Sequence, residues 1–271
     1  ARGRLLSYRP GDIISRAERA VGEGVREIWL TSQDAGAYGM DCDYPLSRLL
    51  ANLCDISGDF RIRLGMTSPI WIYEDLDEIL NVMEHKKMFK FLHIPLQSGS
   101  NHVLADMKRG NTREQFVELC DEFRSRFPLG ALMTDIIVGF PTETEEDFRQ
   151  TLSVIERVGT AAVNRSKFSP RPGTSAASMK RICGEIVSRR SRELNEVVRR
   201  VARRYIQGWL GRAEMVVTAD YKKDGTVMAH NTAYRPVVLE GDWPLGASIH
   251  VRFDGCTDFH LEGTPDIPAS S

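Results

Sequence analysis

This sequence lacks several motifs that would by themselves identify a class of protein. Its five cysteines are scattered, and no two of them stand at the spacing of a metal-binding pair. They form no dense disulfide framework either, which favours a reducing compartment, so we expect a cytoplasmic protein. No apolar run is long enough to span a bilayer, and we expect no membrane partner. A glycine-rich phosphate loop is also missing, which argues against kinases and nicotinamide-dependent dehydrogenases.

Charge is nearly balanced over the whole chain but unevenly distributed toward its C-terminal end. The 271 residues carry a formal net charge of −1. Residues 180–207 hold nine Lys/Arg against three Asp/Glu, whereas residues 208–271 hold five against nine. This asymmetry indicates two neighbouring parts with different surroundings.

Short apolar runs alternate with segments of helical period over the first two thirds of the chain. The predicted strands are Glu27–Thr31, Arg61–Met66, Phe89–Pro95, Leu132–Gly139 and Ala161–Phe168. The predicted helices are Asp12–Glu23, Pro45–Ile56, Glu74–Glu84, Thr112–Phe127 and Thr144–Val158. Such alternation predicts an α/β fold with parallel strands and right-handed crossovers, in an open sheet or a barrel. In both arrangements chemistry takes place at the carboxyl ends of the strands, where polar Gly/Pro-rich loops follow here.

The pattern changes near residue 180. Ile186–Gln207 has the period of a long helix with arginines on one side. The runs that follow are short and alternating: Glu214–Thr218, Val227–His230, Pro236–Leu239, Ser248–Phe253 and Asp258–Glu262. Turn signals separate them, so we predict a small all-β antiparallel barrel. The predicted domains are therefore residues 1–180, a connecting helix at 181–207, the barrel at 208–266 and a tail at 267–271.

An ordered set of motifs resembles the methylthiotransferase family of radical S-adenosylmethionine enzymes. The motifs are Arg2-Gly3, Ser7-Tyr8-Arg9-Pro10, Leu30-Thr31-Ser32-Gln33-Asp34, His93-Ile94-Pro95-Leu96-Gln97-Ser98-Gly99-Ser100, Met107-Lys108-Arg109, Asp135-Ile136-Ile137-Val138-Gly139-Phe140-Pro141-Thr142-Glu143-Thr144 and Ser169-Pro170-Arg171-Pro172-Gly173-Thr174. The final barrel resembles the family's RNA-binding TRAM module, which is OB-like. The resemblance covers nearly the whole chain.

The resemblance implies a specific activity. Gly65-Met66-Thr67-Ser68-Pro69 is most similar to the archaeal and eukaryotic branch, which adds a methylthio group to C2 of N6-threonylcarbamoyladenosine beside the tRNA anticodon. The implied cofactors are S-adenosylmethionine and [4Fe-4S] clusters, and the implied partner is tRNA; the sulfur and electron donors stay unidentified. Alternatives are the branches acting on isopentenyladenosine or a ribosomal protein, another radical enzyme, and a cluster-free RNA-binding protein on the same scaffold.

The sequence departs from the family in one respect. Members carry a Cys-x3-Cys-x2-Cys loop shortly before the position of Arg2-Gly3, and an N-terminal domain with three further cysteines. Neither is found in this sequence. Because clusters are held by closely placed thiolates, we predict no metal ligand here and expect this piece alone to be inactive. The expected fold is thus a partial (β/α)6-type radical barrel that lacks its first strand, followed by the TRAM barrel.

The candidate cofactor-binding residues follow the resemblance and the residue types. They are Ser32, Gln33, Asp34, Arg63, Gln97, Ser98, Asp135, Gly139, Phe140 and Arg171. Asp34 either binds the methionyl amino group or caps a turn, and Arg63 either points inward to an anion or lies on an exposed face. The serines of the loop after the third strand either bind ligand or bond within the loop. His93 is expected to be a core histidine, Glu143 a helix-start residue, and no catalytic residue is assigned.

The candidate RNA-binding residues lie on the basic helix and on a loop of the barrel. They are Arg189, Arg192, Arg199, Arg200, Arg203, Asn231, Tyr234 and Arg235. The loop assignment is implied by the resemblance. Phosphate affinity depends mostly on positive charge, which favours the helix over the acidic barrel. The alternative for the helix is a solvated amphipathic face.

Overall fold

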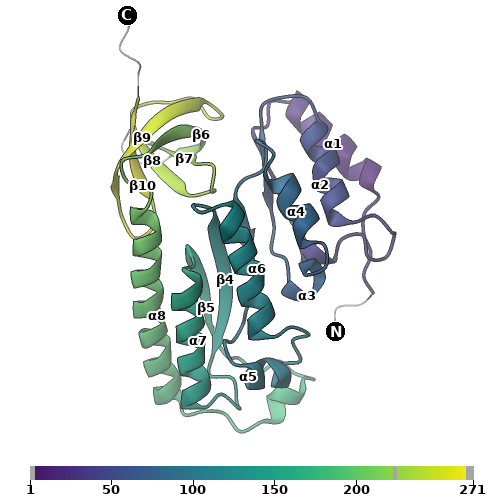
Figure 1. Cartoon of the computed structure of the whole chain (residues 1–271), viewed down its shortest axis with the longest axis vertical. Coiled ribbons are helices and arrows are strands. Elements are labelled where there is room, and N and C mark those ends of the chain that lie inside the picture. The colour runs from purple at the N-terminus through teal and green to yellow at the C-terminus, as the bar shows by residue number, and fades with distance from the viewer. Residues whose placement is uncertain (1–3, 222–224, 267–271) are drawn as a thin grey trace, which may run out of the picture.

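The computed structural model describes residues 4–221 and 225–266. An α/β part forms the larger body, and a small β-barrel lies over one end of its sheet, beyond the end of the long helix α8 (Figure 1). The predicted tail at 267–271 falls outside the described residues. No helix in the described part of the chain is long and apolar enough to cross a membrane.

Five parallel strands run through the α/β part in chain order. They are β1 (Glu27–Leu30), β2 (Arg61–Leu64), β3 (Phe91–His93), β4 (Ala131–Val138) and β5 (Ala162–Lys167). β1 pairs with β2, and β3, β4 and β5 pair with one another. Single parallel bridges from Ile62 to Met88 and from Met66 to His93 connect the two groups. The predicted parallel α/β alternation is confirmed, with each strand close to its predicted position.

Helices fill the connections between these strands. They are α1 (Pro10–Gly22), α2 (Leu46–Asp55), α3 (Pro69–Ile72), α4 (Leu76–Met83), α5 (Asn101–Asp106), α6 (Arg113–Arg126) and α7 (Glu145–Val158), with short 3-10 turns η1 (Ala35–Ala37) and η2 (Ser175–Ser178). α6 and α7 begin at Thr112 and Thr144, each of which forms a capping box with the residue three positions on. α3 and α5 were not predicted, because four and six residues are too few to show a helical period.

The two faces of the sheet have different surroundings, because successive side chains of a strand point to opposite sides. Ile62, Leu64 and Leu92 are fully buried and belong to the core packed under the helices. The residues between them, such as Arg63 and His93, point to the other, inner face. The core therefore fixes the sheet from outside and leaves polar and aromatic side chains inside.

The C-terminal part is a closed barrel reached through α8 (Gly184–Gln207). Its strands are β6 (Ala213–Tyr221), β7 (Thr226–His230), β8 (Pro236–Glu240), β9 (Ser248–Cys256) and β10 (Leu261–Pro265). Around the barrel they stand in the order β10-β8-β7-β6-β9. The prediction of an all-antiparallel barrel needs one correction, because β10 lies parallel to β8 and closes the barrel. Hairpin patterns in sequence do not reveal this pairing between strands that are not consecutive.

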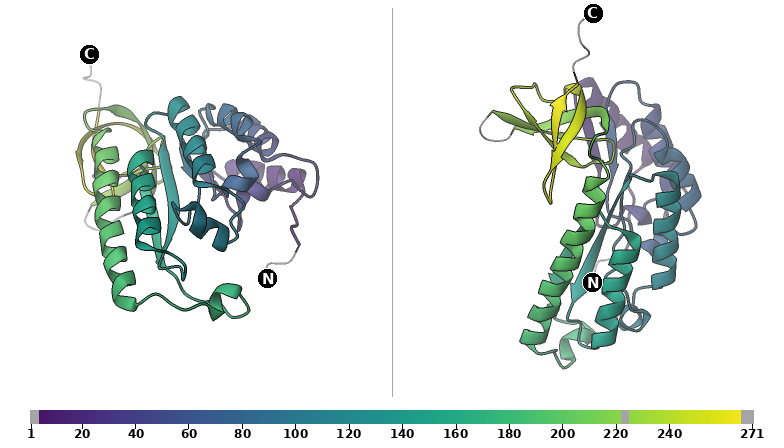
Figure 2. Two further views of the ribbon diagram at one scale, coloured as in Figure 1. Left: turned by 60° about the horizontal axis from the view of Figure 1, so that its bottom comes forward. Right: turned by 60° about the vertical axis from the view of Figure 1, so that its left-hand side comes forward.

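A joint between the two parts holds the barrel against the amino ends of the strands. The Lys90 amide donates to the Thr232 carbonyl at 2.8 Å, and the His230 ring lies 2.9 Å from a carboxylate oxygen of Glu27. α8 runs alongside the sheet and leads into the barrel in both views of Figure 2. This joint between the α/β part and the barrel was not predicted from the sequence.

Candidate functional site

A polar cluster occupies the inner face of the sheet near the carboxyl ends of its strands. Asp135 on β4 stands in register with Asn164 on β5, whose Nδ2 donates to Asp135 Oδ1 at 2.8 Å. His93 Nε2 lies 3.1 Å from the same oxygen. Burial tends to raise the pKa of Asp135, but the His93 hydrogen bond and charge, the Asn164 amide and the Arg109 guanidinium outweigh it and lower that pKa. Asp135 is therefore held as an oriented carboxylate.

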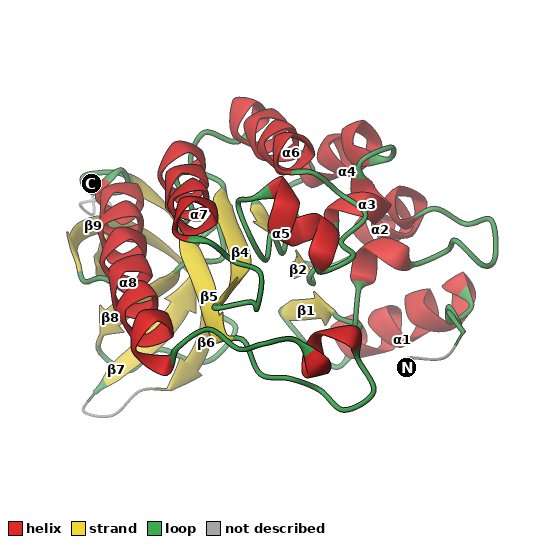
Figure 3. Cartoon of the chain, turned by 90° about the horizontal axis from the view of Figure 1, so that it is seen from below, coloured by secondary structure: helices red, strands yellow, loops and turns green. Residues whose placement is uncertain are grey.

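This cluster borders a cavity of about 1060 Å³. Figure 3 looks onto this end of the molecule, where the loop after β5 crosses in front of the strand ends. Carboxylates, basic side chains, amides and aromatic rings line the cavity. They are Asp106 and Asp135; Lys108, Arg109, Lys167 and Arg171; Gln97 and Asn164; and Phe140 and Phe168. A cavity with charges of both signs and aromatic rings suits a zwitterionic ligand that also carries a base.

Two residues of the cavity have backbone conformations that side chains rarely adopt. Gln97 has φ 73° and Lys108 has φ 55°, both in the left-handed region. The Gln97 amide donates to the Asp135 carbonyl at 2.7 Å, and its carbonyl accepts from the Ile137 amide at 2.9 Å. Strained backbone of this kind concentrates at functional sites. Gln97, Asp135 and Arg171, three of the candidate cofactor residues, line this one cavity.

The turn after β4 is fixed by its contacts with α8 and Glu143. Gly139 has φ 81°, and a Cβ there would lie 2.6 Å from Val187 of α8. Its amide donates to Glu143 at 3.0 Å, and Glu143 in turn is 2.7 Å from the buried Arg190. Glycine is therefore required at this turn by its φ and by the packing of α8. Phe140 is 4% exposed and still contributes an edge to the cavity.

Six of the ten candidate cofactor residues do not line this cavity; besides Gly139 and Arg63 they are Ser32, Gln33, Asp34 and Ser98. Ser98 is fully buried: its hydroxyl lies 3.4 Å from that of Thr151 and accepts from the Ser100 amide, so it bonds within the fold. Asp34 caps η1 by accepting from the Gly36 amide at 3.2 Å, and also accepts from the Ser68 amide at 3.0 Å. The turn-capping alternative is thus the one observed. Ser32 and Gln33 are exposed and do not line the cavity.

Arg63 meets aromatic rings where an anion was expected. Its guanidinium carbon lies 4.8 Å from the ring centres of Phe91 and Tyr234 and 5.6 Å from that of Trp29. Its buried Nε has no hydrogen-bond partner among the described residues. Cation–π attraction replaces a counter-ion at this position. The prediction of a cofactor carboxylate on Arg63 is therefore corrected to a contact in the joint between sheet and barrel.

The loop of the barrel that was predicted to bind RNA is part of the same joint. Asn231 is 1% exposed, and its side-chain oxygen accepts from the amides of Ala233 and Arg235. The Tyr234 ring stacks on His230 with centres 4.2 Å apart and contacts Phe89 and Phe91 edge-on. The docked sheet thus packs against this loop. RNA contact by Asn231 and Tyr234 has no support from this placement.

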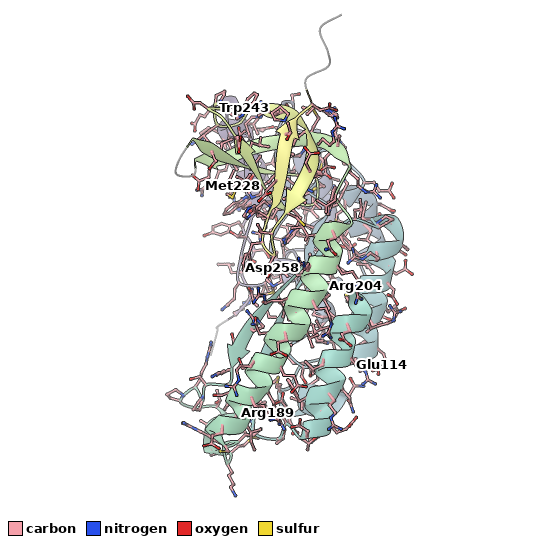
Figure 4. All side chains as sticks on the ribbon, turned by 90° about the vertical axis from the view of Figure 1, so that its left-hand side faces the viewer. Glu114, Arg189, Arg204, Met228, Trp243 and Asp258 are labelled. Atoms are coloured by element: carbon pink, nitrogen blue, oxygen red, sulfur yellow. The ribbon has the colours of Figure 1, made fainter. Side chains whose placement is uncertain are left out.

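The arginines of α8 divide into two sides. Arg189 pairs with Glu145 at 2.7 Å and Arg200 pairs with Glu156, so both fasten α8 to α7. Arg192, Arg199 and Arg203 are exposed and follow one another at intervals of seven and four residues, which places them on one stripe. Figure 4 shows the exposed side of α8 leading up to the barrel turn that contains Asp258. Arg192 and Arg203 of the second stripe form no ion pair among the described residues, whereas Arg199 pairs with Asp258.

Some site residues were missed from the sequence. His93 and Asn164 orient Asp135, and Lys108 and Arg109 supply cations to the cavity. Asn164 stands in register with Asp135, and local sequence does not give the register between strands, so no signal in the sequence singled it out. His93 is a buried histidine as predicted, but one with a specific acidic partner.

The described residues differ in how well they fit the two expected cofactors. No group of three or more His, Cys, Asp or Glu side chains could hold a metal ion in the part of the chain that the structure describes, and all five cysteines are unpaired thiols. These residues therefore do not fit an iron–sulfur cluster. The cavity does fit S-adenosylmethionine, whose amino group, carboxylate and adenine match its acidic, basic and aromatic groups.

Comparison with known proteins identifies the class. Residues 1–155 match the Radical SAM superfamily, and the chain belongs to it. Coproporphyrinogen III oxidase from Escherichia coli has a similar fold, with a TM-score of 0.51 and 13% identity over 93% of this chain and 62% of that one.

Within that superfamily the similarity is concentrated in one group of enzymes. A probable threonylcarbamoyladenosine tRNA methylthiotransferase from Archaeoglobus fulgidus is 42% identical over 97% of this chain and 62% of its own length. The Drosophila melanogaster threonylcarbamoyladenosine tRNA methylthiotransferase is 38% identical over 97% of this chain and 48% of its own. The chain thus spans about half to three fifths of the relatives that it matches.

Proposed function

We propose that this chain is the radical-site and RNA-docking part of a tRNA methylthiotransferase that modifies C2 of N6-threonylcarbamoyladenosine. The observation that carries the proposal is the cavity at the carboxyl ends of the strands, with the Asp135 cluster on one side and Arg171 at its rim. The relatives with 38–42% identity carry this activity in their names. In that reaction S-adenosylmethionine supplies the radical and the methyl group.

The chain's own residues bind and orient in this proposal. Asp135, fixed by His93 and Asn164, accepts from the amino group of the methionyl part, while a basic side chain of the cavity holds its carboxylate. The 3-10 turn η2 and the preceding loop cover the cavity and limit access of water. The described residues offer no cluster ligands, so we expect this chain by itself to be inactive.

The finer architecture is part of the proposal. Five parallel strands in chain order, with no second partner on β1 among the described residues, support a partial (β/α)6 barrel. A five-stranded closed barrel with the order β6-β7-β8-β10-β9 supports an OB-like module of the TRAM kind. A cytoplasmic location, the expectation from the scattered thiols, also belongs to it.

Nucleoside mass spectrometry of tRNA tests the function. Cells that lack the full-length gene should lose the 2-methylthio form of N6-threonylcarbamoyladenosine and accumulate its precursor. Full-length protein should restore the modification, and this chain alone should not. An unchanged modification in the deletion strain would overturn the proposal and direct attention to isopentenyladenosine or a ribosomal protein. Restoration by the chain alone would overturn its expected inactivity.

A further inference from the structure

An aromatic side chain is held out into solvent beside a basic cleft. Phe259 is 74% exposed and lies in the turn between β9 and β10. The cleft beside it, of about 510 Å³, lies between β5, α8 and this turn. It is lined by apolar and basic side chains, among them Val163, Val198, Arg165, Arg199 and the half-buried Arg235.

The turn that carries Phe259 is fixed from several sides. The Thr257 hydroxyl accepts from the amides of Phe259 and His260 at 3.1 and 3.2 Å. Arg235 donates to the Phe259 carbonyl at 3.2 Å, and Arg199 binds the Asp258 carboxylate at 2.6 Å. A rigid backbone under an exposed ring means that the ring is presented without an ordering cost on binding. Neither core of the described residues includes Phe259, so folding does not explain its position.

The charge of the cleft selects the class of partner. Three arginines line it against one acid, Asp258, which Arg199 already neutralises. Arg192 and Arg203 extend the same side of α8 and form no ion pair among the described residues. A flat apolar ring framed by guanidinium groups fits an unstacked base between phosphates, because every base has a face that stacks on an aromatic ring.

The position of the cleft also favours a nucleic acid. β5 separates it from the large cavity: Arg165 lines the cleft, and the next residue, Ser166, lines the cavity. In OB-like barrels the loop between the fourth and fifth strands is one of those that contact oligonucleotides, and Phe259 occupies that loop here. A strand that lies across the β5 edge would therefore connect this cleft with the proposed reaction site.

We propose that Phe259 and the cleft of Arg165, Arg199 and Arg235 bind a single-stranded segment of tRNA, with one base stacked on the Phe259 ring. This inference rests on the proposed function; of the loop residues predicted to bind RNA it keeps Arg235, and it replaces Asn231 and Tyr234 by Phe259. Binding of RNA here requires neither cluster nor S-adenosylmethionine.

The test is the affinity of this chain for a fluorescein-labelled anticodon stem-loop RNA, measured by anisotropy over a salt series. Phe259→Ala should weaken binding between about fivefold and a hundredfold, the range for loss of one base–aromatic stack. Phe259→Tyr should keep the affinity, and Phe259→Leu should not, because leucine is apolar without a flat ring. Arg203→Gln should weaken binding and reduce the slope of log affinity against log salt by about 0.7.

Leu245→Ala is the matched control, since Leu245 is an apolar side chain of the same barrel, 49% exposed, on a different cavity. It should bind RNA as the parent does. Binding of Phe259→Ala within twofold of the parent, or no RNA binding by the parent chain, would overturn the inference. So would loss of self-association in Phe259→Ala with RNA affinity unchanged. The tRNA modification assay is independent, so failure here leaves the proposed function standing.

Discussion

The inner face of the sheet carries a histidine–carboxylate pair at each of its two ends, and their surroundings differ. His93 and Asp135 lie 3.1 Å apart beside the large cavity, with side chains 11% and 26% exposed. His230 and Glu27 lie 2.9 Å apart in the joint with the barrel, with side chains 7% and 11% exposed. Tyr234 stacks on His230 and seals the second pair. The same type of pair thus faces a cavity at one end and fastens two domains at the other.

The largest loss of stability is expected at the buried ion pair between Arg190 and Glu143. Arg190→Met leaves Glu143 buried without its cation, because their side chains are only 5% and 2% exposed. The free energy of unfolding should fall by about 3–5 kcal/mol. Urea unfolding measures it, and Arg189→Met is the control, since its exposed pair with Glu145 should contribute at most about 1 kcal/mol. Equal losses in the two variants would show that burial does not decide this energy.

A substitution in the joint should have the next largest effect. Glu27→Ala leaves the buried His230 ring without its acceptor, which should cost about 1–3 kcal/mol of unfolding free energy. Asp59→Ala is the control, because its ion pair with Arg26 is exposed and should contribute at most about 1 kcal/mol. Affinity for S-adenosylmethionine should be unchanged in both, as measured by calorimetry. A loss of that affinity in Glu27→Ala would contradict the separation of the two ends.

Lowering the pH should reduce the free energy of unfolding through the carboxyl group of Asp147, which accepts a hydrogen bond from Ser100. Burial tends to raise the pKa of this carboxyl, but hydrogen bonds from Ser100, Thr144 and His102 outweigh it and lower the pKa to about 2. A lowered pKa stabilises the fold fully above the unfolded value near 3.8, and the stabilisation is lost as pH falls toward 2. Asp147→Asn should therefore cost about 2 kcal/mol at pH 7 and almost nothing at pH 2.

Thermal unfolding between pH 2 and pH 7 measures this dependence. Asp121→Asn removes an exposed carboxylate that pairs with Arg157, and its curve should follow that of the parent. A difference between Asp147→Asn and the parent that stays constant over the whole range would show that the carboxylate charge is not responsible.

The smallest effect on stability is expected at the pair of His93 and Asp135, in contrast to the pair of His230 and Glu27. Asp135→Ala should cost less than about 1 kcal/mol, because water from the cavity can replace the carboxylate at His93 and Asn164. Its affinity for S-adenosylmethionine should fall about tenfold or more, since a charged hydrogen bond is lost. Unchanged affinity with a large loss of stability would reverse the roles assigned to the two pairs.

Local pattern in the sequence predicted the elements well and their mutual contacts poorly. Asp135 is a candidate site residue from the sequence alone, but its partners His93 and Asn164 are 42 and 29 residues away. Periodicity says which face a residue occupies and does not give the register between strands. The residue types around the cavity were therefore predictable, while the arrangement that orients Asp135 was not.

The corrected residues fail for a related reason. Tyr234 lies in a turn that would be exposed on an isolated barrel, and only the docked sheet covers it. Arg63 has the alternation of an inward arginine, yet its partners are the rings of two separate domains. Asp34 does cap a turn, which its position before Gly36 allowed. Contacts between domains leave little trace in local sequence.

The joint also determines how long part of the nascent chain stays uncovered during synthesis. Glu27 and His230 are 203 residues apart in the sequence. At 5–20 residues per second, Glu27 is synthesised roughly 10–40 s before its partner exists. Throughout that time Trp29 and Arg63 lack the Tyr234 ring that covers them in the folded protein. The amino-terminal strands therefore emerge with an open aromatic surface, and completion of the small barrel is the event that closes it.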